Sequence, residues 1–176
     1  IGLIHSAVSA TAIERWATCA GNGGLYLNQI KPLQPYAIRG VTWYQGEWDS
    51  RSAKDSEKYY WQMPCLIHEW RNDWGQDPLE FPFYIVQMPK MGISSIHIVR
   101  DAELQTALDD PKVEMIVTID NPGRDVHPPC KELFGVRLAN LALKFEDGQS
   151  IDARSPFYNA AASYVYGDTI RVVFDN

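Results

Sequence analysis

Four apolar runs divide this chain, and their spacing is the feature that most limits the folds open to it. They occupy residues 1–4, 38–44, 83–88 and 113–119. The segments between them have helical character and are long enough to cross over a sheet, as parallel strands require. Strands that alternate with helices form a parallel sheet covered on both faces. We therefore predict an α/β fold.

Three of the segments outside these runs are expected to form helices, and the first and third carry apolar stripes. The first is expected from about Ser56 to Trp74 and contains Pro64, which should kink the helix or mark a late start. A shorter helix is expected from Arg100 to Leu108, and a third should stop near Gly148. The first stripe consists of Tyr59, Met63, Leu66, Trp70 and Trp74, and the third of Phe134, Leu138, Leu141 and Phe145. Each stripe gives its helix one face to bury.

The pattern changes to alternation near the end of the chain. Tyr164 and Tyr166 precede a Gly-Asp turn, after which every second residue is again apolar. This is typical of a β-hairpin. We predict an α/β domain over residues 1–150 and a hairpin over 151–176 that starts a C-terminal β region. The domain is expected to be incomplete at its N-terminus, because Ile1 already begins a strand pattern.

Charge and hydropathy exclude some classes of partner. The chain has 16 Lys and Arg against 22 Asp and Glu, a formal net charge of −6, and no basic run. This balance argues against nucleic acid and against an anionic membrane surface. No stretch approaches the roughly 20 apolar residues of a membrane span. Small neutral or modestly polar ligands fit better.

The Cys and His residues support neither a disulfide framework nor a metal site. Cys19, Cys65 and Cys130 are too few and too scattered for a framework, which leaves the redox compartment open. The four His include no pair at helical spacing. No phosphate loop or dinucleotide motif follows a strand. We expect no metal and no other cofactor.

His127 is the strongest single catalytic candidate. It lies in a Gly/Pro-rich loop after the run 113–119, and a rigid, exposed loop suits a general base. Asp125 can orient the imidazole and stabilise its cation, and Asp120 is a rival for that role. From spacing alone an ordinary surface His is the commoner outcome, because short motifs have low specificity.

The run 38–44 ends in Gln45, Gly46 and Glu47, at the edge of the sheet where open α/β folds bind ligands. Gly46 lets the backbone approach a ligand, and an amide here can donate to a developing oxyanion. A tight turn after a strand explains the Gly equally well.

Glu47 has two interpretations. It can be the acid or nucleophile of a glycosidase, paired with Asp49 or Asp125. It can also be a partly buried structural acid held by Arg100 or Arg39, which is the interpretation that we favour.

Ser6 and Ser9 follow the first apolar run, where a βα turn presents groups to the sheet edge. Neither lies in a Gly-x-Ser-x-Gly elbow. We expect residues of this kind to cap the helix that begins near Ile13.

Seven collinear segments resemble the sialate O-acetylesterase group of SGNH hydrolases, which is similar to the acetyl xylan esterases. IGLIHSAVSATAIERW resembles the family's IGLINSSWGGTPIEAW, and IRGVTWYQGEWDS resembles its strand followed by WYQGESNA or WYQGESDA. The segments FPFYIVQM, RDAELQ, VTIDN, DVHPPCK and GVRLANLAL follow in the family's order. The matching segments run through almost the whole chain, and their common order makes the resemblance stronger than any single match.

The resemblance implies a flavodoxin-like α/β/α domain that deacetylates sugar hydroxyls through a Ser nucleophile, a His base and an oxyanion hole. His127 matches the family's catalytic His, and Asp125 matches the acidic residue before it. Gly46 falls in the block that shapes the oxyanion side. The family's nucleophile belongs to a GQSNM motif upstream of IGLI, and this chain contains no GQSNM. We therefore expect a fragment of a longer esterase.

Three departures from the family pattern bear on the substrate. Ser9-Ala10 stands where the family has Gly-Gly, and His5 replaces a usual Asn or Ser. Trp48 replaces a small residue, where a bulky ring would narrow the pocket or stack on a sugar. The identity of the sugar is therefore not carried over.

The leading hypothesis is a carbohydrate O-acetylesterase whose parent is active, whereas this segment alone is inactive. The alternative is a non-catalytic carbohydrate-binding or scaffold protein that keeps the fold without the nucleophile. The resemblance favours an exported protein, periplasmic or secreted. The expected site residues are of two kinds, catalytic and oxyanion or substrate-binding: His127 and Asp125, and then Gln45, Gly46, Glu47 and Trp48.

Overall fold

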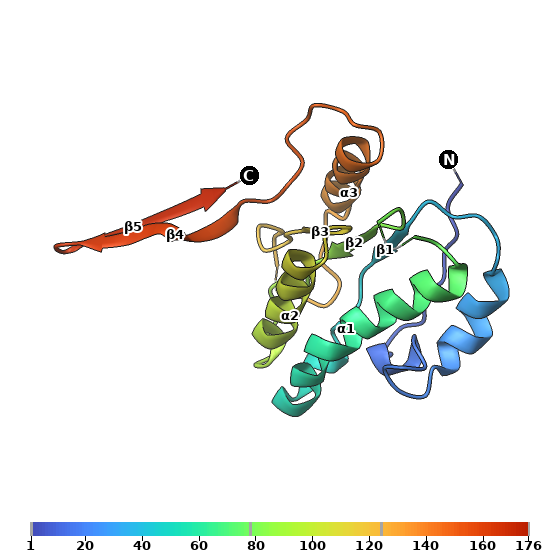
Figure 1. The fold of residues 1–176 in the computed structure, drawn as a ribbon. Helices are drawn as coiled ribbons and strands as arrows, with labels where there is room; N and C mark the ends of the chain where they lie inside the picture. The colour runs from blue at the N-terminus through green and yellow to red at the C-terminus, as the bar shows by residue number, and fades with distance from the viewer. Residues whose placement is uncertain (1, 78, 124, 176) are drawn as a thin grey trace.

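A parallel sheet lies at the centre of the computed structural model (Figure 1). Its order is β1-β2-β3, with β1 at Val41–Trp43, β2 at Phe83–Val86 and β3 at Val113–Ile116. The registers are aligned, since Val41 pairs with Phe83 and Phe83 pairs with Val113. Three of the four predicted strands are therefore confirmed, each shorter than its apolar run.

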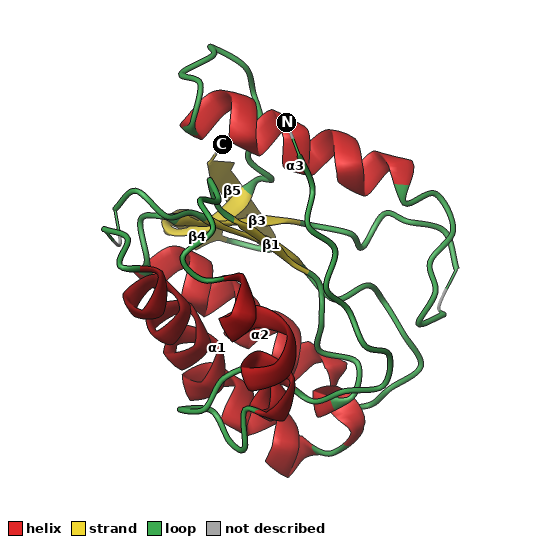
Figure 2. Ribbon diagram, turned by 90° about the vertical axis from the view of Figure 1, so that its right-hand side faces the viewer, coloured by secondary structure: helices red, strands yellow, loops and turns green. Residues whose placement is uncertain are grey.

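Helices cover both faces of the sheet, which confirms the predicted three-layer α/β/α class. Helices α1 (Ala53–Trp74) and α2 (Ile96–Asp109) lie on one face, and α3 (Glu132–Phe145) lies on the other (Figure 2). No helix within the described part of the chain is both long enough and apolar enough to cross a membrane. The two helical layers make β2 a buried central strand.

The side chains of β2 divide between two cores. Phe83 and Ile85 belong to the larger core beside α1 and α2, whereas Tyr84 and Val86 pack in a smaller core with Phe134 of α3. This follows from the period of two along a strand, which sends alternate side chains to opposite faces. All four residues of β2 are buried, as a strand covered on both faces requires.

Helix α1 is longer at its N-terminus than predicted. Ser52 is its N-cap and accepts a hydrogen bond from the main-chain N–H of Asp55 at 3.1 Å. Gly75 ends the helix in the left-handed conformation, with a φ of 64°. Pro64 lies inside the helix, so it does not mark a late start.

The first predicted strand is wrong. Residues 2–8 have no regular secondary structure, and the side chain of Leu3 is 94% exposed. A strand needs a neighbour to satisfy its N–H and C=O groups. No strand of the described chain, which comprises residues 2–77, 79–123 and 125–175, pairs with this segment.

The predicted capping by the early Ser residues is also wrong. The short 3-10 helix η1 (Ile13–Arg15) has Ala12 at its N-cap, without a side-chain cap. Ser6 Oγ instead donates to Gln29 Oε1 at 2.8 Å. The main-chain N–H of Ile13 donates to the carboxylate of Asp49 at 3.1–3.2 Å. A residue distant in sequence therefore caps this helix.

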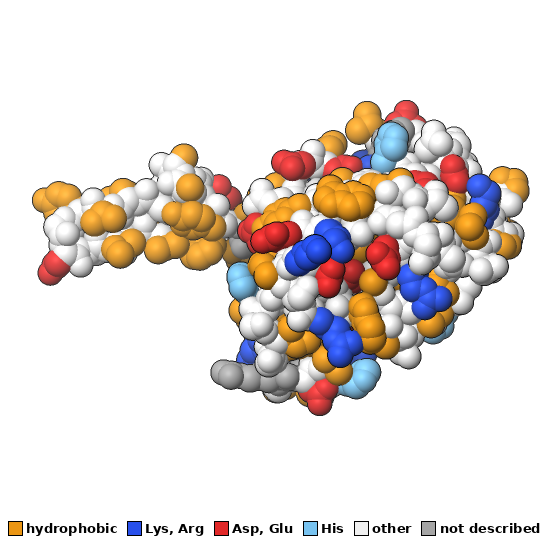
Figure 3. Space-filling model, turned by 90° about the horizontal axis from the view of Figure 1, so that it is seen from below, with side chains coloured by type: hydrophobic (Ala, Val, Ile, Leu, Met, Phe, Trp, Pro, Cys, Tyr) orange, Lys and Arg blue, Asp and Glu red, His pale blue; other side chains and the backbone are white. Residues whose placement is uncertain are grey.

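The predicted hairpin is present and extends away from the three-layer body (Figures 1 and 3). Strand β4 (Phe157–Tyr166) pairs antiparallel with β5 (Thr169–Asp175), and Gly167 turns the chain with a φ of 60°. The apolar side chains along the hairpin are largely exposed: Tyr158, Tyr164, Val165, Tyr166, Ile170, Val172 and Phe174. The division into two domains stays a prediction.

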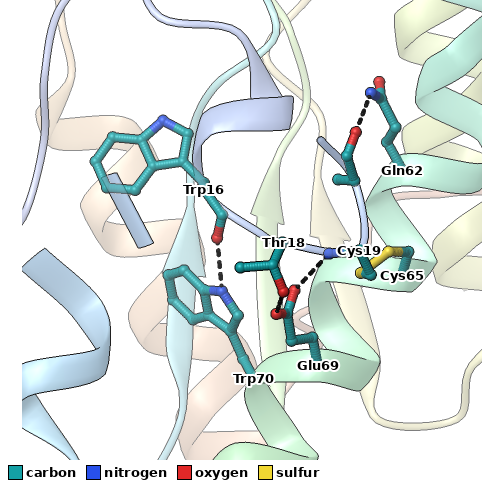
Figure 4. The surroundings of a disulfide bond; sticks show 8 residues. Trp16, Thr18, Cys19, Gln62, Cys65, Glu69 and Trp70 are labelled. Atoms are coloured by element: carbon teal, nitrogen blue, oxygen red, sulfur yellow. Dashed lines mark hydrogen bonds between the residues drawn. A yellow bond between two sulfur atoms is a disulfide. The ribbon is translucent and has the colours of Figure 1, made fainter. Parts of the chain in front are cut away.

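One disulfide, which the scattered Cys spacing did not predict, joins Cys19 to Cys65 of α1 (Figure 4). The two residues are 46 positions apart, and their Cα atoms lie 6.2 Å apart. Hydrogen bonds flank the disulfide, with Trp70 Nε1 donating to the Trp16 carbonyl oxygen at 2.9 Å. Cys130 is free and exposed. The disulfide joins the segment after η1 to helix α1.

Candidate functional site

The carboxyl ends of the three parallel strands meet at one edge of the sheet. There β1 continues into Gln45, Gly46 and Glu47, β2 into Gln87, and β3 into the loop that contains His127. Such an edge is the usual ligand site of an open α/β fold. The fold therefore brings the two predicted polar segments to the same side of the domain.

The side chain of Gln45 joins two separate segments. Its Nε2 donates to the Thr11 carbonyl oxygen at 2.8 Å and to Asp49 Oδ2 at 2.5 Å. Both N–H groups of this amide are thus bonded within the protein. The hydroxyl of Tyr59 donates to the main-chain oxygen of Gln45 at 2.8 Å. The network fixes the turn after β1 against the segment that precedes η1.

Asp49 is the centre of this network and is almost fully buried. Burial raises the pKa of its carboxyl from 3.8 to about 6, against the opposing effect of the hydrogen bonds from Gln45 and Ile13. The carboxylate holds the N-terminus of η1 through the Ile13 N–H. Asp49 was considered in the sequence only as a partner for Glu47, and its burial became visible only in the fold.

Gly46 is required by its surroundings. Its φ is 153°, and an added Cβ would lie 2.9 Å from Val99 Cγ1 and 3.0 Å from Met88 Cγ. The turn after β1 therefore packs directly on β2's extension and on α2, which only Gly permits. The close approach that the sequence predicted is made here to protein side chains.

Glu47 makes no ion pair with Arg39 or Arg100 among the described residues, so the favoured structural interpretation is wrong in that detail. The residue is half-buried, and its main-chain oxygen accepts a hydrogen bond from Ser50 Oγ at 2.8 Å. Arg100 instead donates to Gln87 Oε1 at 3.3 Å. Hydrogen bonds within the turn position Glu47, and the described residues give it no ion-pair partner.

Glu103 is a buried acid that sequence reasoning missed. It is fully buried, and its Oε2 accepts a hydrogen bond from the main-chain N–H of Met88 at 2.9 Å. Burial raises the pKa of this carboxyl well above its usual range. The available signal was its place on the apolar face of α2, four residues after Val99. The Glu103 side chain therefore holds the main chain at Met88, just after β2.

His127 is exposed in the loop after β3, as predicted for a general base. Its main-chain N–H donates to Asp125 Oδ1 at 3.0 Å, which closes a tight Asx turn. Asn121 Nδ2 donates to the carbonyl oxygens of Pro129 and Cys130 at 3.3 and 3.4 Å, joining the two ends of the loop. Asn121 was not predicted, and it restrains the loop that carries His127.

Asp120 is committed to another partner. Its Oδ1 accepts a hydrogen bond from Arg137 at 2.8 Å, and its second oxygen is also bonded to that guanidinium. Arg137 further donates to the Val117 carbonyl oxygen at 2.6 Å. The pair with Arg137 lowers the pKa of the Asp120 carboxyl below its usual range. Asp120 thus anchors α3 to the end of β3.

Trp48 follows the turn after β1 in the chain, and the residue is 44% exposed. The Arg51 guanidinium carbon lies 4.2 Å from the ring centroid, a cation–π contact that restrains the indole. Trp48 therefore presents an aromatic side chain of restricted mobility next to the turn after β1. Within the described residues, no cluster of three or more His, Cys, Asp or Glu side chains could hold a metal ion.

A parallel sheet covered on both faces, with its polar loops at the carboxyl edge, defines the three-layer α/β class to which SGNH-type hydrolases belong. A family model described as "Carbohydrate esterase, sialic acid-specific acetylesterase" matches residues 1–144. The chain belongs to this family of carbohydrate esterases.

Individual relatives agree with the family match. The chain is 32% identical to the mouse sialate O-acetylesterase over 134 residues, which cover 65% of this chain and 24% of that protein. It is 30% identical to the human sialate O-acetylesterase over 180 residues, covering 78% and 34% respectively. The chain thus spans about a quarter to a third of the length of these relatives.

A solved structure supports the fold in the same way. The crystal structure of a carbohydrate acetylesterase from Xanthomonas citri superposes with a TM-score of 0.81 at 29% identity, covering 94% of this chain and 41% of that one. A protein from Arabidopsis thaliana superposes with a TM-score of 0.61 at 27% identity, covering 76% and 57%. The likeness to this carbohydrate acetylesterase therefore covers almost the whole chain and supports the α/β/α assignment of the body.

Proposed function

We propose that this chain is the main part of the catalytic domain of a carbohydrate O-acetylesterase, related to the sialate O-acetylesterases, which hydrolyses acetyl esters on sugars. Family membership supports the reaction class. The observation that carries the site assignment is that the turn after β1 and the loop after β3 follow strands of one parallel sheet. The nucleophilic Ser belongs to a part of the parent protein outside this segment, which alone is inactive.

His127 is the general base of this mechanism. Its imidazole takes the proton of the Ser hydroxyl as the oxygen attacks the acetyl carbonyl, and the resulting oxyanion is stabilised by hydrogen-bond donors. Collapse of this intermediate releases the sugar hydroxyl, which receives the proton from His127. Water then attacks the acetyl-enzyme as His127 takes its proton. The bond to the Ser oxygen breaks, that oxygen regains the proton from His127, and acetate is released.

Asp125 is the residue that we assign to orient His127. Its Oδ1 accepts a hydrogen bond from the main-chain N–H of His127 at 3.0 Å. We assign its other oxygen to the imidazole. The competing carboxylate of Asp120 is occupied by Arg137, which supports this choice. On this basis Asp125→Asn lowers kcat more than Asp120→Asn does.

The turn after β1 forms the oxyanion and substrate side of the site. Gln45 acts by position, because its amide fixes the Thr11 segment beside the turn. Gly46 and Glu47 supply the wall that faces the acetyl group, and Trp48 contacts the sugar. The network around Asp49 gives this wall its rigidity.

The test is acetyl release from an acetylated sugar by the full-length parent protein. His127→Ala should lower the rate at least about 100-fold, the usual contribution of a general base. His68→Ala is the matched control, because His68 is an exposed His on α1. Equal rates for the parent and its His127→Ala form would remove His127 from the mechanism.

A non-catalytic carbohydrate-binding protein is the second candidate. It is favoured by one observation, that both N–H groups of the Gln45 amide are already bonded within the protein. The two candidates differ upstream of this segment in the parent gene, where the esterase requires a GQSNM-like segment on a strand. A parent protein that binds sugars but releases no acetate would establish the second candidate.

The disulfide supports the expectation of export. Disulfides persist in oxidising compartments and are rare in the reducing cytosol. The Cys19–Cys65 bridge therefore fits a periplasmic or secreted parent.

A further inference from the structure

A polar pocket of about 230 Å³ opens between η1, the turn after β1 and the first turns of α1. The pocket adjoins the turn that carries Gln45, because Trp48 and Asp49, which follow that turn in the chain, are two of its lining residues. Drug-sized ligands occupy pockets of roughly 300–1,000 Å³, so this volume suits a single sugar ring. Its lining includes Glu14, Trp48, Asp49, Asp55, Lys58 and Gln62.

Trp48 is the one aromatic residue of the pocket lining. Arg51 restrains the indole by stacking on it at 4.2 Å, and the residue remains 44% exposed. A restrained ring costs little conformational entropy when a ligand packs on it. The C–H faces of a pyranose are apolar and match such a surface, whereas its hydroxyls point outward toward polar groups.

The charges of the lining select against anions. Glu14, Asp49 and Asp55 give the lining three acidic side chains. Lys58 is the one cation of the lining and is paired with Asp55 at 2.8 Å. The balance remains negative even when Arg51 is counted. A carboxylate or phosphate ligand would meet like charge here. Uncharged hydroxyls can donate to the carboxylates and accept from the remaining N–H groups of Lys58.

Gln62 adds a further polar group to the lining. The residue is 3% exposed, and its Nε2 donates to the Ala20 carbonyl oxygen at 2.9 Å. This bond fixes the amide, whose carbonyl oxygen accepts no hydrogen bond from the described residues. A fixed acceptor in a pocket discriminates between ligands that carry a hydroxyl at that place and those that lack one.

We propose that this pocket binds one uncharged pyranose unit of the acetylated carbohydrate, stacked on Trp48 and held by the carboxylates and Lys58. The inference rests on the proposed function for the source of the sugar. It goes beyond that function by assigning a neutral sugar, and not the carboxylate-bearing unit of a sialoside, to this position.

The test is an NMR titration of the full-length parent protein with methyl β-galactopyranoside and, separately, with N-acetylneuraminic acid. The neutral glycoside should shift the amide signals of the pocket lining, and the acid should bind at least about tenfold more weakly, a difference of about 1.4 kcal/mol. Trp48→Ala should weaken binding of the neutral glycoside at least about tenfold. Trp61→Ala is the matched control, because Trp61 is 51% exposed on α1 and does not line the pocket.

Further variants test the charge argument and keep the result interpretable if Trp48→Ala does not fold. Lys58→Met should also weaken binding of the neutral glycoside, whereas Glu14→Lys should strengthen binding of N-acetylneuraminic acid. Tighter binding of the acid than of the neutral glycoside by the unmodified parent protein would overturn the proposal. So would unchanged binding in both Trp48→Ala and Lys58→Met, or the absence of any shift at millimolar glycoside.

Acetyl release by the parent protein separates this proposal from the proposed function. Sugar binding without acetyl release overturns the esterase and leaves the pocket assigned. Acetyl release without sugar binding at this pocket overturns the pocket and leaves the esterase assigned.

Discussion

Removal of the Cys19–Cys65 disulfide should destabilise the protein chiefly through its unfolded state. The bridge closes a loop across 46 positions, and the chain-entropy relation gives about 4 kcal/mol for a loop of that length. The folded state changes little, because hydrogen bonds beside the bridge remain, including those from Trp70 to Trp16 and from Gln62 to Ala20. We therefore expect Cys19→Ser/Cys65→Ser to lower the free energy of unfolding by about 2–4 kcal/mol.

Equilibrium urea unfolding followed by circular dichroism measures this loss. With a slope of about 2 kcal/mol per molar urea, the midpoint should fall by about 1–2 M. Addition of a reductant to the unmodified protein should reproduce the shift, and the double variant should not respond to it. Cys130→Ser is the control, since Cys130 is free and exposed and its loss should leave the midpoint unchanged. Equal midpoints under oxidising and reducing conditions would refute the reasoning.

Two further predictions concern the turn after β1. The pKa of Asp49 in the folded protein, about 6, lies above its ordinary 3.8, so ionisation of Asp49 disfavours folding as the pH rises from 4 to 6. Relative to Asp49→Asn, the unmodified protein should therefore lose up to about 3 kcal/mol of unfolding free energy over that window. Parallel pH profiles of the two proteins would contradict this. Gly46→Ala should destabilise by about 1–3 kcal/mol in thermal or urea unfolding, because its Cβ would collide with Val99. Gly135→Ala, whose Cβ meets nothing within 4 Å on helix α3, should instead stabilise by about 0.5–1 kcal/mol, and a similar loss in both variants would argue against a local clash.

Local patterns in the sequence predicted the elements that satisfy their own hydrogen bonds or bury a periodic face. The helical stripe from Tyr59 to Trp74 lies within α1, and the alternation around Tyr164 lies within the hairpin. Residues 1–4 show the limit of this reasoning. Their apolar pattern resembles that of β2, but a strand also needs a hydrogen-bonding neighbour, which no local pattern can supply.

The candidate site divides in the same way. The sequence predicted the two polar segments, after the runs 38–44 and 113–119, and a parallel sheet brings them to one edge. Neither the roles of Asp49 and Glu103 nor the pairing of Asp120 with Arg137 could be predicted. These depend on contacts between residues that are 15 or more positions apart in the sequence.

By itself, the sequence determined the α/β class, the family, and the residue types available for catalysis, because hydrophobic period and collinear motifs are properties of the chain. Only the tertiary structure decided that Asp49 caps η1, that Gly46 packs on Val99, and that Cys19 lies within reach of Cys65. Burial and distance are set by packing between segments, and a residue's pKa and partners follow from them. The pocket beside Trp48 is a product of that packing, formed where η1, the turn after β1 and α1 meet.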